Sequence, residues 1–173
     1  MKKFLSLFVI AFVAIGLIGC NDTEGTMAAP EAGSIDMSNI DEYLYNEEFQ
    51  YVDLRNFDDQ MADGWIRGFE IIPFFDYLEY SDILVRVDDW SFSEATIKDA
   101  NGLRALFDED KYIVLMCAGG TRAGFVKEAL ESLGYENVYN AGGLGDYDGD
   151  NKVYGDGEYT IVMNHPAVTD ALP

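Results

Sequence analysis

The chain has 173 residues, and its 11 Lys and Arg against 32 Asp and Glu give a formal net charge of −21 at pH 7. With 49% hydrophobic and 14% aromatic residues, it has enough apolar side chains for the core of one domain, unlike acidic disordered chains. The acidity excludes nucleic acid as a partner, because phosphate binding needs a basic surface.

Residues 1–19 have the pattern of a signal peptide: two lysines follow Met1, and the rest is uncharged, largely apolar and too short to span a membrane. The segment ends in Leu-Ile-Gly before Cys20, which resembles the lipobox of bacterial lipoproteins. The resemblance implies cleavage before Cys20 and acylation of this residue. We therefore expect a protein held at the membrane by its lipid anchor only, on the periplasmic or extracellular face of the bacterial cell envelope. The alternative is an ordinary secretory signal with an incidental cysteine.

Composition divides the remaining chain into three segments. After Cys20, residues 20–37 are mostly small or polar, which indicates a flexible tether. Apolar runs typical of a folded domain occupy residues 38–145, beginning with a short helix around Ile40. Residues 146–173 form an acidic, Gly-rich C-terminal extension.

Strands and helices alternate within the domain. Strands are expected at residues 50–54, 71–73, 112–116 and 138–139, and helices at residues 57–62, 95–107 and 122–133. The second helix is expected to follow a capping box that starts at Ser91 and to be interrupted near Gly102, and the third to end at Gly134. Such alternation predicts an α/β domain with a central, mainly parallel sheet flanked by helices.

The strand at residues 112–116 leads directly into Cys117, which is followed by a Gly-Gly pair, Arg122 and a helix. The backbone N–H groups of such a loop and the helix dipole favour a thiolate over a thiol. Gly119 and Gly120 permit the tight turn that an anion-binding loop needs. Arg122 adds a positive charge that either binds an anionic substrate or orients the loop. The alternative is a buried cysteine that packs as a small hydrophobic residue.

With its flanking strand and helix, this segment resembles the active-site loop of rhodanese domains: Cys117-Ala118-Gly119-Gly120-Thr121-Arg122. Three other segments match motifs of the family in order and spacing. They are an early strand that ends in Asp-x-Arg at residues 51–55, a Gly-x-Ile-x-Gly turn at residues 64–73, and a closing strand with a Gly-Gly turn at residues 133–143. The resemblance covers about residues 40–144 and implies a rhodanese-like three-layer fold.

The resemblance also implies sulfur transfer. The Cys117 thiolate would take the outer sulfur of a polysulfide, persulfide or thiosulfate and pass it from a Cys117 persulfide to a thiol or another nucleophile. Four residues separate Cys117 from Arg122, whereas the related phosphatases and arsenate reductases have five. The shorter loop favours sulfane sulfur over a tetrahedral oxyanion, so a phosphatase-like or arsenate-reducing enzyme is the least favoured alternative.

The sequence departs from the family pattern at two positions. Many thiosulfate-using members have Arg directly after the Cys, where this chain has Ala118, and this favours a neutral or thiol-borne donor. Trp65 replaces the usual His and is expected to alter packing at the base of the loop. Asp53 and Arg55 are expected to support the site as a structural pair that orders the neighbouring turn. Ala118 and the acidity also leave open a domain that carries sulfur or docks a protein without turnover.

The C-terminal extension opens with alternate acidic residues in a Gly-rich loop, Asp146, Asp148 and Asp150. Alternate carboxylates are one pattern of a Ca²⁺ site, but Asn151 stands where an EF-hand requires Gly, and Gly157 where it requires the bidentate Glu. A solvated acidic turn is the favoured interpretation, and apart from this calcium candidate the sequence predicts no cofactor.

Overall fold

The computed structural model describes residues 30–31 and 33–154. The expected signal peptide, Cys20 with the first part of the tether, and the extension beyond residue 154 lie outside this range. Within it, no helix is both long and apolar enough to cross a membrane. The elements, in chain order, are η1 (Ile40–Glu42), β1 (Phe49–Asp53), α1 (Phe57–Asp63), β2 (Trp65–Ile66), β3 (Glu70–Ile71), η2 (Phe74–Glu79), η3 (Glu94–Thr96), α2 (Ala100–Leu106), β4 (Tyr112–Cys117), α3 (Thr121–Ser132), β5 (Val138–Gly143), η4 (Leu144–Asp146) and β6 (Lys152–Val153).

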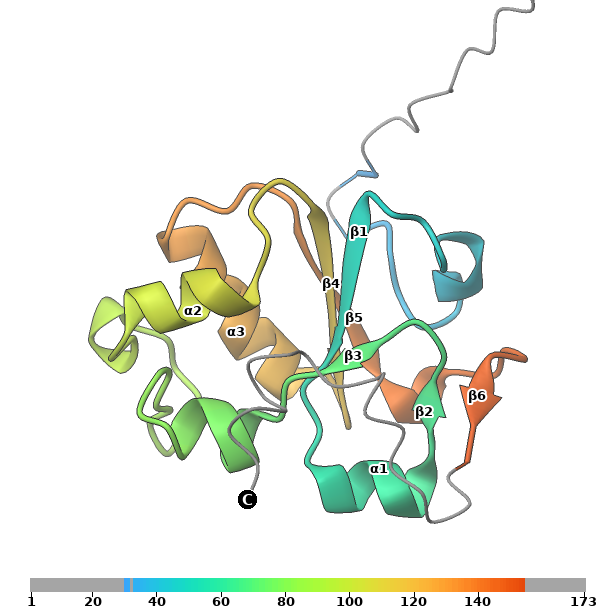
Figure 1. Ribbon diagram of the computed structural model, residues 1–173, viewed down its shortest axis with the longest axis horizontal. Coiled ribbons are helices and arrows are strands. Elements are labelled where there is room, and N and C mark those ends of the chain that lie inside the picture. The colour runs from blue at the N-terminus through green and yellow to red at the C-terminus, as the bar shows by residue number, and fades with distance from the viewer. Residues whose placement is uncertain (1–29, 32, 155–173) are drawn as a thin grey trace, which may run out of the picture.

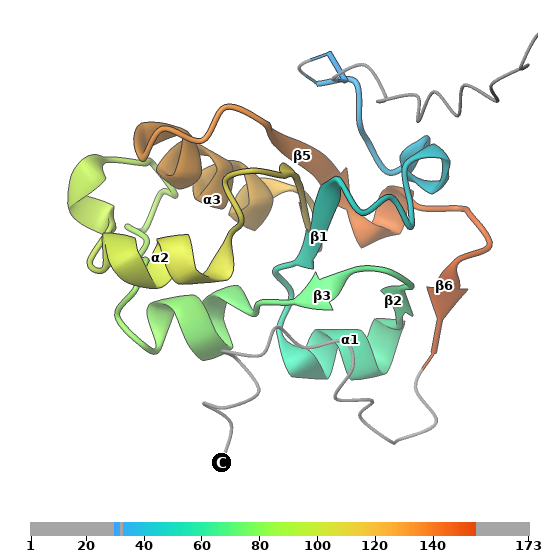
Figure 2. The same ribbon diagram turned by 45° about the horizontal axis from the view of Figure 1, so that its top comes forward.

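A four-stranded parallel sheet with the order β3-β1-β4-β5 forms the centre of the molecule (Figure 1). β4 is the apolar run predicted at residues 112–116, and it lies between β1 and β5. β3 is an edge strand, as expected for a strand that ends before Pro73. Helices α2 and α3 cover one face of the sheet, and the N-terminal segment with η1 covers the other (Figure 2). The predicted α/β class with a central parallel sheet is therefore confirmed.

Successive residues of a strand point to opposite faces of a sheet, and this alternation gives the molecule two separate cores. In β4, Ile113, Leu115 and Cys117 belong to the core that includes residues of α2 and α3. Val114 and Met116 belong to the core on the other face. Cys117 thus ends a buried strand on the side of the sheet that α3 covers.

The helices predicted at residues 57–62 and 122–133 are present as α1 and α3. The single helix predicted at residues 95–107 was wrong, because the structure divides it into η3 and α2. The division lies at Ile97, which bridges to Leu84. Gly102, where the interruption was expected, lies inside α2 and donates its N–H to the Asp99 carboxylate at 2.9 Å. A side-chain cap at Asp99 therefore starts a new helix where the apolar pattern alone suggested continuity.

The folded domain begins before residue 38, earlier than predicted. Ile35 and Met37 are buried in the core that also holds Ile40. The Met37 N–H donates to the Ala141 carbonyl at 3.0 Å, which ties this segment to β5. The last part of the predicted tether is thus packed on the sheet. Two isolated apolar residues in a polar stretch carry no periodicity by which this could be recognised.

The domain also continues past the predicted boundary at residue 145. Tyr147 is buried, and its hydroxyl donates to Asp41 Oδ1 at 2.7 Å. Further on, β6 pairs antiparallel with β2, so that Lys152 lies opposite Ile66 (Figure 1). Trp65, the other residue of β2, is half-buried and pairs with Val153. The extension as far as residue 154 is therefore part of the fold.

Candidate active site

Cys117 is the last residue of β4 and lies beneath a loop that reaches the surface. Only 1% of the residue is exposed, whereas Ala118, Gly119 and Thr121 in the loop above it are exposed. The Gly120 N–H points at the sulfur, with the nitrogen 3.1 Å from Sγ, and α3 begins at the next residue. A backbone donor and the first turn of a helix therefore lie next to the thiol, and both stabilise negative charge.

The Cys117 loop packs closely against the end of β5. Gly143 pairs with Cys117, and a Cβ at Gly143 would overlap the Ala118 carbonyl oxygen and lie 2.7 Å from the Gly119 Cα. Gly120 has a φ of 87°, a left-handed conformation that favours glycine. Backbone fit, rather than side-chain contact, thus sets the shape of the loop. Gly143 belongs to the Gly-Gly turn that the sequence had singled out.

Asn140 is a second support of the loop, and no sequence pattern pointed to it. Its Nδ2 donates to the Gly120 carbonyl at 3.0 Å, while its Oδ1 accepts the Gly142 N–H at 3.0 Å. The pairing of β4 with β5 shifts register between Leu115 and Met116, opposite this part of β5. The irregularity aims the Asn140 amide at the loop, and a strand pattern of alternating apolar residues does not reveal it.

Arg122 was expected either to bind an anionic substrate or to orient the loop, and its contacts are with the protein. Its Nη1 donates to the Leu54 carbonyl at 3.3 Å and lies 3.7 Å from Asp59 Oδ2. Its guanidinium lies over the Phe75 ring, 5.5 Å from the centroid, and only 11% of its side chain is exposed. These contacts tie the start of α3 to the turn after β1 and support the orienting role.

Asp53 and Arg55 form a buried ion pair, with Arg55 Nη2 2.7 Å from Asp53 Oδ2. Asp53 Oδ1 also accepts the Arg55 backbone N–H at 2.9 Å, and Arg55 Nη2 donates to the Gly64 carbonyl at 2.7 Å. The pair therefore holds the turn after β1 against the residue that precedes β2. In the described part of the chain, Arg55 Nη1 is buried without a hydrogen-bond partner.

A pocket of about 330 Å³ opens beside the Cys117 loop. It lies between the loop, the start of η4, helix α1 and strand β6, and α1, β2 and β6 stand together at this end of the sheet (Figure 1). Its lining consists of Arg55, Asp59, Asp63, Ala118, Leu144, Gly145 and Lys152. The sequence did not predict Asp63 or Lys152 as site residues, since their proximity depends on the pairing of β6 with β2.

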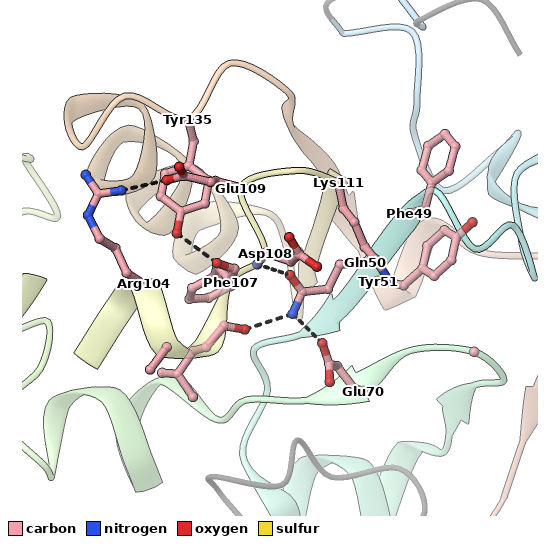
Figure 3. A pocket seen from close by; sticks show the side chains of 13 residues that line it. Phe49, Gln50, Tyr51, Glu70, Arg104, Phe107, Asp108, Glu109, Lys111 and Tyr135 are labelled. Atoms are coloured by element: carbon pink, nitrogen blue, oxygen red, sulfur yellow. Dashed lines mark hydrogen bonds and ion pairs between the residues drawn. The ribbon is translucent and has the colours of Figure 1, made fainter. Parts of the chain in front are cut away.

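A larger hollow of about 880 Å³ lies at the opposite end of the sheet, beside the first residues of β1 (Figure 3). Several of its polar groups are paired with one another. Gln50 Nε2 donates to Glu70 Oε1 at 2.5 Å and to the Leu106 carbonyl at 2.8 Å, and Arg104 lies 2.7 Å from Glu109. Its lining contains no cysteine, so the chemistry of this domain is better sought at the Cys117 loop.

The calcium candidate Asp146, Asp148 and Asp150 lies within residues 33–154, and no group of at least three His, Cys, Asp or Glu side chains in that range could hold a metal ion. The turn is shaped by protein contacts instead. Tyr147 is buried within it, and a Cβ at Gly149 would overlap the carboxylate that accepts the Tyr147 hydroxyl. The structure thus lends the calcium site no support.

A parallel α/β sheet whose central strand ends in a cysteine, a glycine loop and a helix has the architecture of a rhodanese-like domain. The family model described as "Rhodanese-like domain" matches residues 36–148, and the chain belongs to this family. The match ends before β6, so Lys152 lies outside it.

Two solved structures are similar to this chain. A rhodanese with anions from E. coli has 24% sequence identity over 62% of this chain and 99% of its own, with a TM-score of 0.41. A rhodanese-like domain protein from Staphylococcus aureus has 21% identity over 70% of this chain and 97% of its own, with a TM-score of 0.47. No curated protein matches the sequence. Family membership supports a sulfurtransferase or another rhodanese-like module in general, acting on sulfur compounds.

Proposed function

We propose that this protein is a sulfurtransferase that carries sulfane sulfur on Cys117. The observation that supports it best is the Gly120 N–H that points at the Cys117 sulfur, with the nitrogen 3.1 Å from Sγ. This contact lies below an exposed loop that leads into α3, and the chain belongs to the rhodanese-like family. In this proposal the loop from Ala118 to Arg122 surrounds the transferred sulfur. Asp53 and Arg55 support the loop from below through the turn after β1.

The reaction has two displacement steps. In the first, the Cys117 thiolate attacks the outer sulfur of a persulfide, polysulfide or thiosulfate and forms an S–S bond to it. The bond between that sulfur and the rest of the donor breaks, and the remainder leaves with the electron pair as a thiolate, a shorter polysulfide or sulfite. In the second step, an acceptor thiolate attacks the outer sulfur of the Cys117 persulfide, and the Cys117 thiolate leaves. Sulfur moves as a neutral atom, so the cycle needs no external oxidant, reductant or cofactor.

The loop acts on the charge that moves during these steps. The outer sulfur of a persulfide carries negative charge, and backbone N–H groups fixed in place stabilise it without reorganising. Gly120 supplies one such donor, and Ala118 and Gly119 add backbone N–H groups in the exposed part of the loop. Because the loop has no side chain beyond a methyl group at these positions, a donor or acceptor molecule can approach closely.

The direct test measures sulfur transfer from polysulfide and from thiosulfate to cyanide and to a thiol, using the full chain in detergent. Cys117→Ser is expected to abolish transfer, while Cys20→Ser, which leaves Cys117 in place, is expected to keep it. Equal activity of Cys117→Ser, or no transfer from any sulfane donor, would refute the proposal.

We also propose that the protein is a lipoprotein of the bacterial cell envelope, anchored through acylated Cys20. The lipobox-like sequence before Cys20 supports this. Cells that express the full chain are expected to incorporate labelled palmitate into it, and Cys20→Ser is expected to remove the label. Label that survives this substitution would contradict lipidation at Cys20.

A carrier or docking module without turnover is the second candidate. Ala118 in place of a basic residue and the burial of Cys117 favour it. Mass spectrometry after polysulfide treatment separates the two. A stable gain of one sulfur on Cys117 without release to cyanide or thiols favours the carrier, while release favours the enzyme. Cys117-dependent hydrolysis of an aryl phosphate would instead revive the phosphatase-like alternative.

A further inference from the structure

We infer that the pocket beside the Cys117 loop binds a zwitterionic amino-acid thiol, with Lys152 facing its carboxylate and Asp63 facing its ammonium group. The inference rests on the proposed sulfur transfer, since such a molecule would be the persulfide donor or the thiol acceptor of that reaction. Free cysteine and its persulfide are the simplest members of this chemical class.

The charged side chains that line the pocket differ in whether they already have a partner of opposite charge. Arg55 is paired with Asp53, which does not line the pocket, and Asp59 lies 3.7 Å from Arg122. By contrast, neither Asp63 nor Lys152 forms an ion pair with any other described residue. Lys152 Nζ lies 5.3 Å from the centroid of the Tyr154 ring, a contact that leaves its charge uncompensated. The pocket therefore offers one free carboxylate and one free ammonium group.

The two charges come from separate elements that are fixed relative to one another. Asp63 is the last residue of α1. It lies on the same face of the helix as Asp59, which comes one helical turn before it. Lys152 lies on β6, which pairs with β2, the strand that directly follows α1. The Arg67 N–H donates to the Asn151 carbonyl at 2.9 Å and extends this pairing. The separation of the two charges is thus set by backbone pairing, which suits a ligand with two charges at a fixed spacing.

The pocket lies within reach of the sulfur chemistry. Ala118, which lines it, directly follows Cys117, and consecutive Cα atoms are about 3.8 Å apart. In cysteine the sulfur is attached one carbon away from the atom that bears both charged groups. The inference therefore places the ligand's sulfur at the Ala118 side of the pocket, next to the loop that covers Cys117.

The charge balance favours a zwitterion over a doubly charged anion such as thiosulfate. A dianion would meet one free cation, Lys152, and the uncompensated carboxylate of Asp63. Arg122 does not help, because its contacts are with Leu54, Asp59 and Phe75. A ligand with no net charge also avoids the repulsion of a protein whose formal charge is −21.

The first test measures binding without turnover. The rate at which iodoacetamide alkylates Cys117 is followed by peptide mass spectrometry on the full chain in detergent, which separates Cys117 from Cys20. S-methylcysteine is the unreactive probe that is expected to slow this rate. S-methylcysteamine, which lacks the carboxylate, and S-methyl-mercaptopropionate, which lacks the ammonium group, are expected to protect less. Lys152→Met is expected to weaken protection by S-methylcysteine about three- to tenfold but to leave S-methylcysteamine unchanged. Asp63→Asn is expected to weaken protection by S-methylcysteine and to leave protection by S-methyl-mercaptopropionate unchanged.

Lys111→Met, at the opposite end of the sheet beside the larger hollow, is the matched control and should change none of these values. Two results overturn the inference: equal protection by all three compounds in the unmodified protein, or a loss in Lys152→Met that does not depend on the ligand carboxylate. The same crossed pattern is expected for KM in turnover with cysteine, cysteamine, mercaptopropionate and mercaptoethanol as acceptors. In this pattern, Lys152→Met affects only acceptors that have a carboxylate, and Asp63→Asn affects only acceptors that have an ammonium group.

The two arms keep the inference separate from the proposed function. Crossed protection without any sulfur transfer would refute the proposed enzyme and leave the binding site standing. Transfer at equal KM to all four thiols would leave the enzyme standing and refute the site.

Discussion

At Gly143 the Cys117 loop passes so close to β5 that a side chain has no space. The neighbouring atoms are backbone atoms of Ala118 and Gly119, which cannot move away as a flexible side chain would. The position therefore couples the end of β5 directly to the loop above the sulfur. A small change here should act on the geometry of the site more than on the stability of the fold.

Gly143→Ala is expected to lower sulfur transfer about 10- to 100-fold, because displacement of a catalytic loop by about 1 Å costs this much. Gly134→Ala is the matched control. Gly134 has a φ of 99° with open space around it, so alanine there costs about 1 kcal/mol of stability at the far end of α3. Transfer per folded molecule should be unchanged in the control. Equal transfer rates in the two variants would show that the close approach at Gly143 does not matter.

The buried pair Asp53–Arg55 gives a second prediction for single residues. Asp53→Asn leaves the Arg55 charge buried and uncompensated, so we expect the free energy of unfolding in urea to fall by about 3–5 kcal/mol. Glu109→Gln is the control, since the Arg104–Glu109 pair has the same distance of 2.7 Å but is exposed to solvent. Its loss should cost at most about 1 kcal/mol. Equal costs for the two substitutions would contradict a supporting role for the buried pair.

The sequence predicted the place of Cys117, at the end of a buried strand and before a helix, better than the contacts of the charged residues around it. Cys117, its two glycines and the helix after them are contiguous, so one pattern brings them together. The contacts of Arg122 with Asp59 and Leu54, in contrast, depend on how α3 lies against the turn after β1. Lys152 was not recognisable as a site residue for the same reason, because no local pattern marks a partner that arrives through tertiary pairing.

Among the elements, those with strong local patterns were predictable. The buried strand β4 and the helix α3 were expected close to their observed ends, since apolar runs and helical periodicity are local properties. The break between η3 and α2 was misplaced because a side-chain cap, not the apolar pattern, decides it. The pairing of β2 with β6 was missed altogether. Each strand has two residues, too few to show any periodicity.

Gly64 is the residue on which the attachment of β6 depends. A Cβ at Gly64 would overlap the Val153 carbonyl oxygen and lie 3.1 Å from Cδ1 of Tyr154, and the φ of 78° already favours glycine. We expect Gly64→Ala to displace β6 and to raise the rate of trypsin cleavage after Lys152 at least about tenfold, because paired backbone resists proteolysis.

Peptide mass spectrometry on a time course of digestion measures this rate. Gly134→Ala, which strains the chain far from β6, should leave cleavage after Lys152 close to that of the unmodified protein. A Gly64→Ala variant cleaved at the same rate as this control would mean that the close approach of β6 to Gly64 is not needed for pairing.

At the scale of the whole molecule, the two faces of the sheet differ in chemistry. The core beneath α2 and α3 is mainly aliphatic and phenylalanine-rich and includes Cys117. The opposite core contains several tyrosines, and burial shifts their titration. Burial raises the pKa of Tyr51 to about 12, and burial together with the hydrogen bond to Asp41 raises the pKa of Tyr147 to about 12. Burial raises the pKa of Tyr139 as well.

These phenols predict how stability depends on alkaline pH. An unfolded tyrosine loses its proton near pH 10.0, whereas Tyr51 and Tyr147 keep theirs to about pH 12 in the folded chain. The folded chain therefore binds more protons between these values, and the stability that the neutral phenols contribute is complete below about pH 10 and falls as the pH rises to about 12.

The free energy of unfolding in urea, measured at steps across this range, should decline as the pH rises. Tyr147→Phe should make the slope of this decline shallower by the contribution of about one proton. Phe69→Leu, in the same core but without an ionisable group, should lower stability equally at every pH and keep the slope of the unmodified protein. A Tyr147→Phe variant with an unchanged slope would mean that this phenol titrates alike in the folded and unfolded chain.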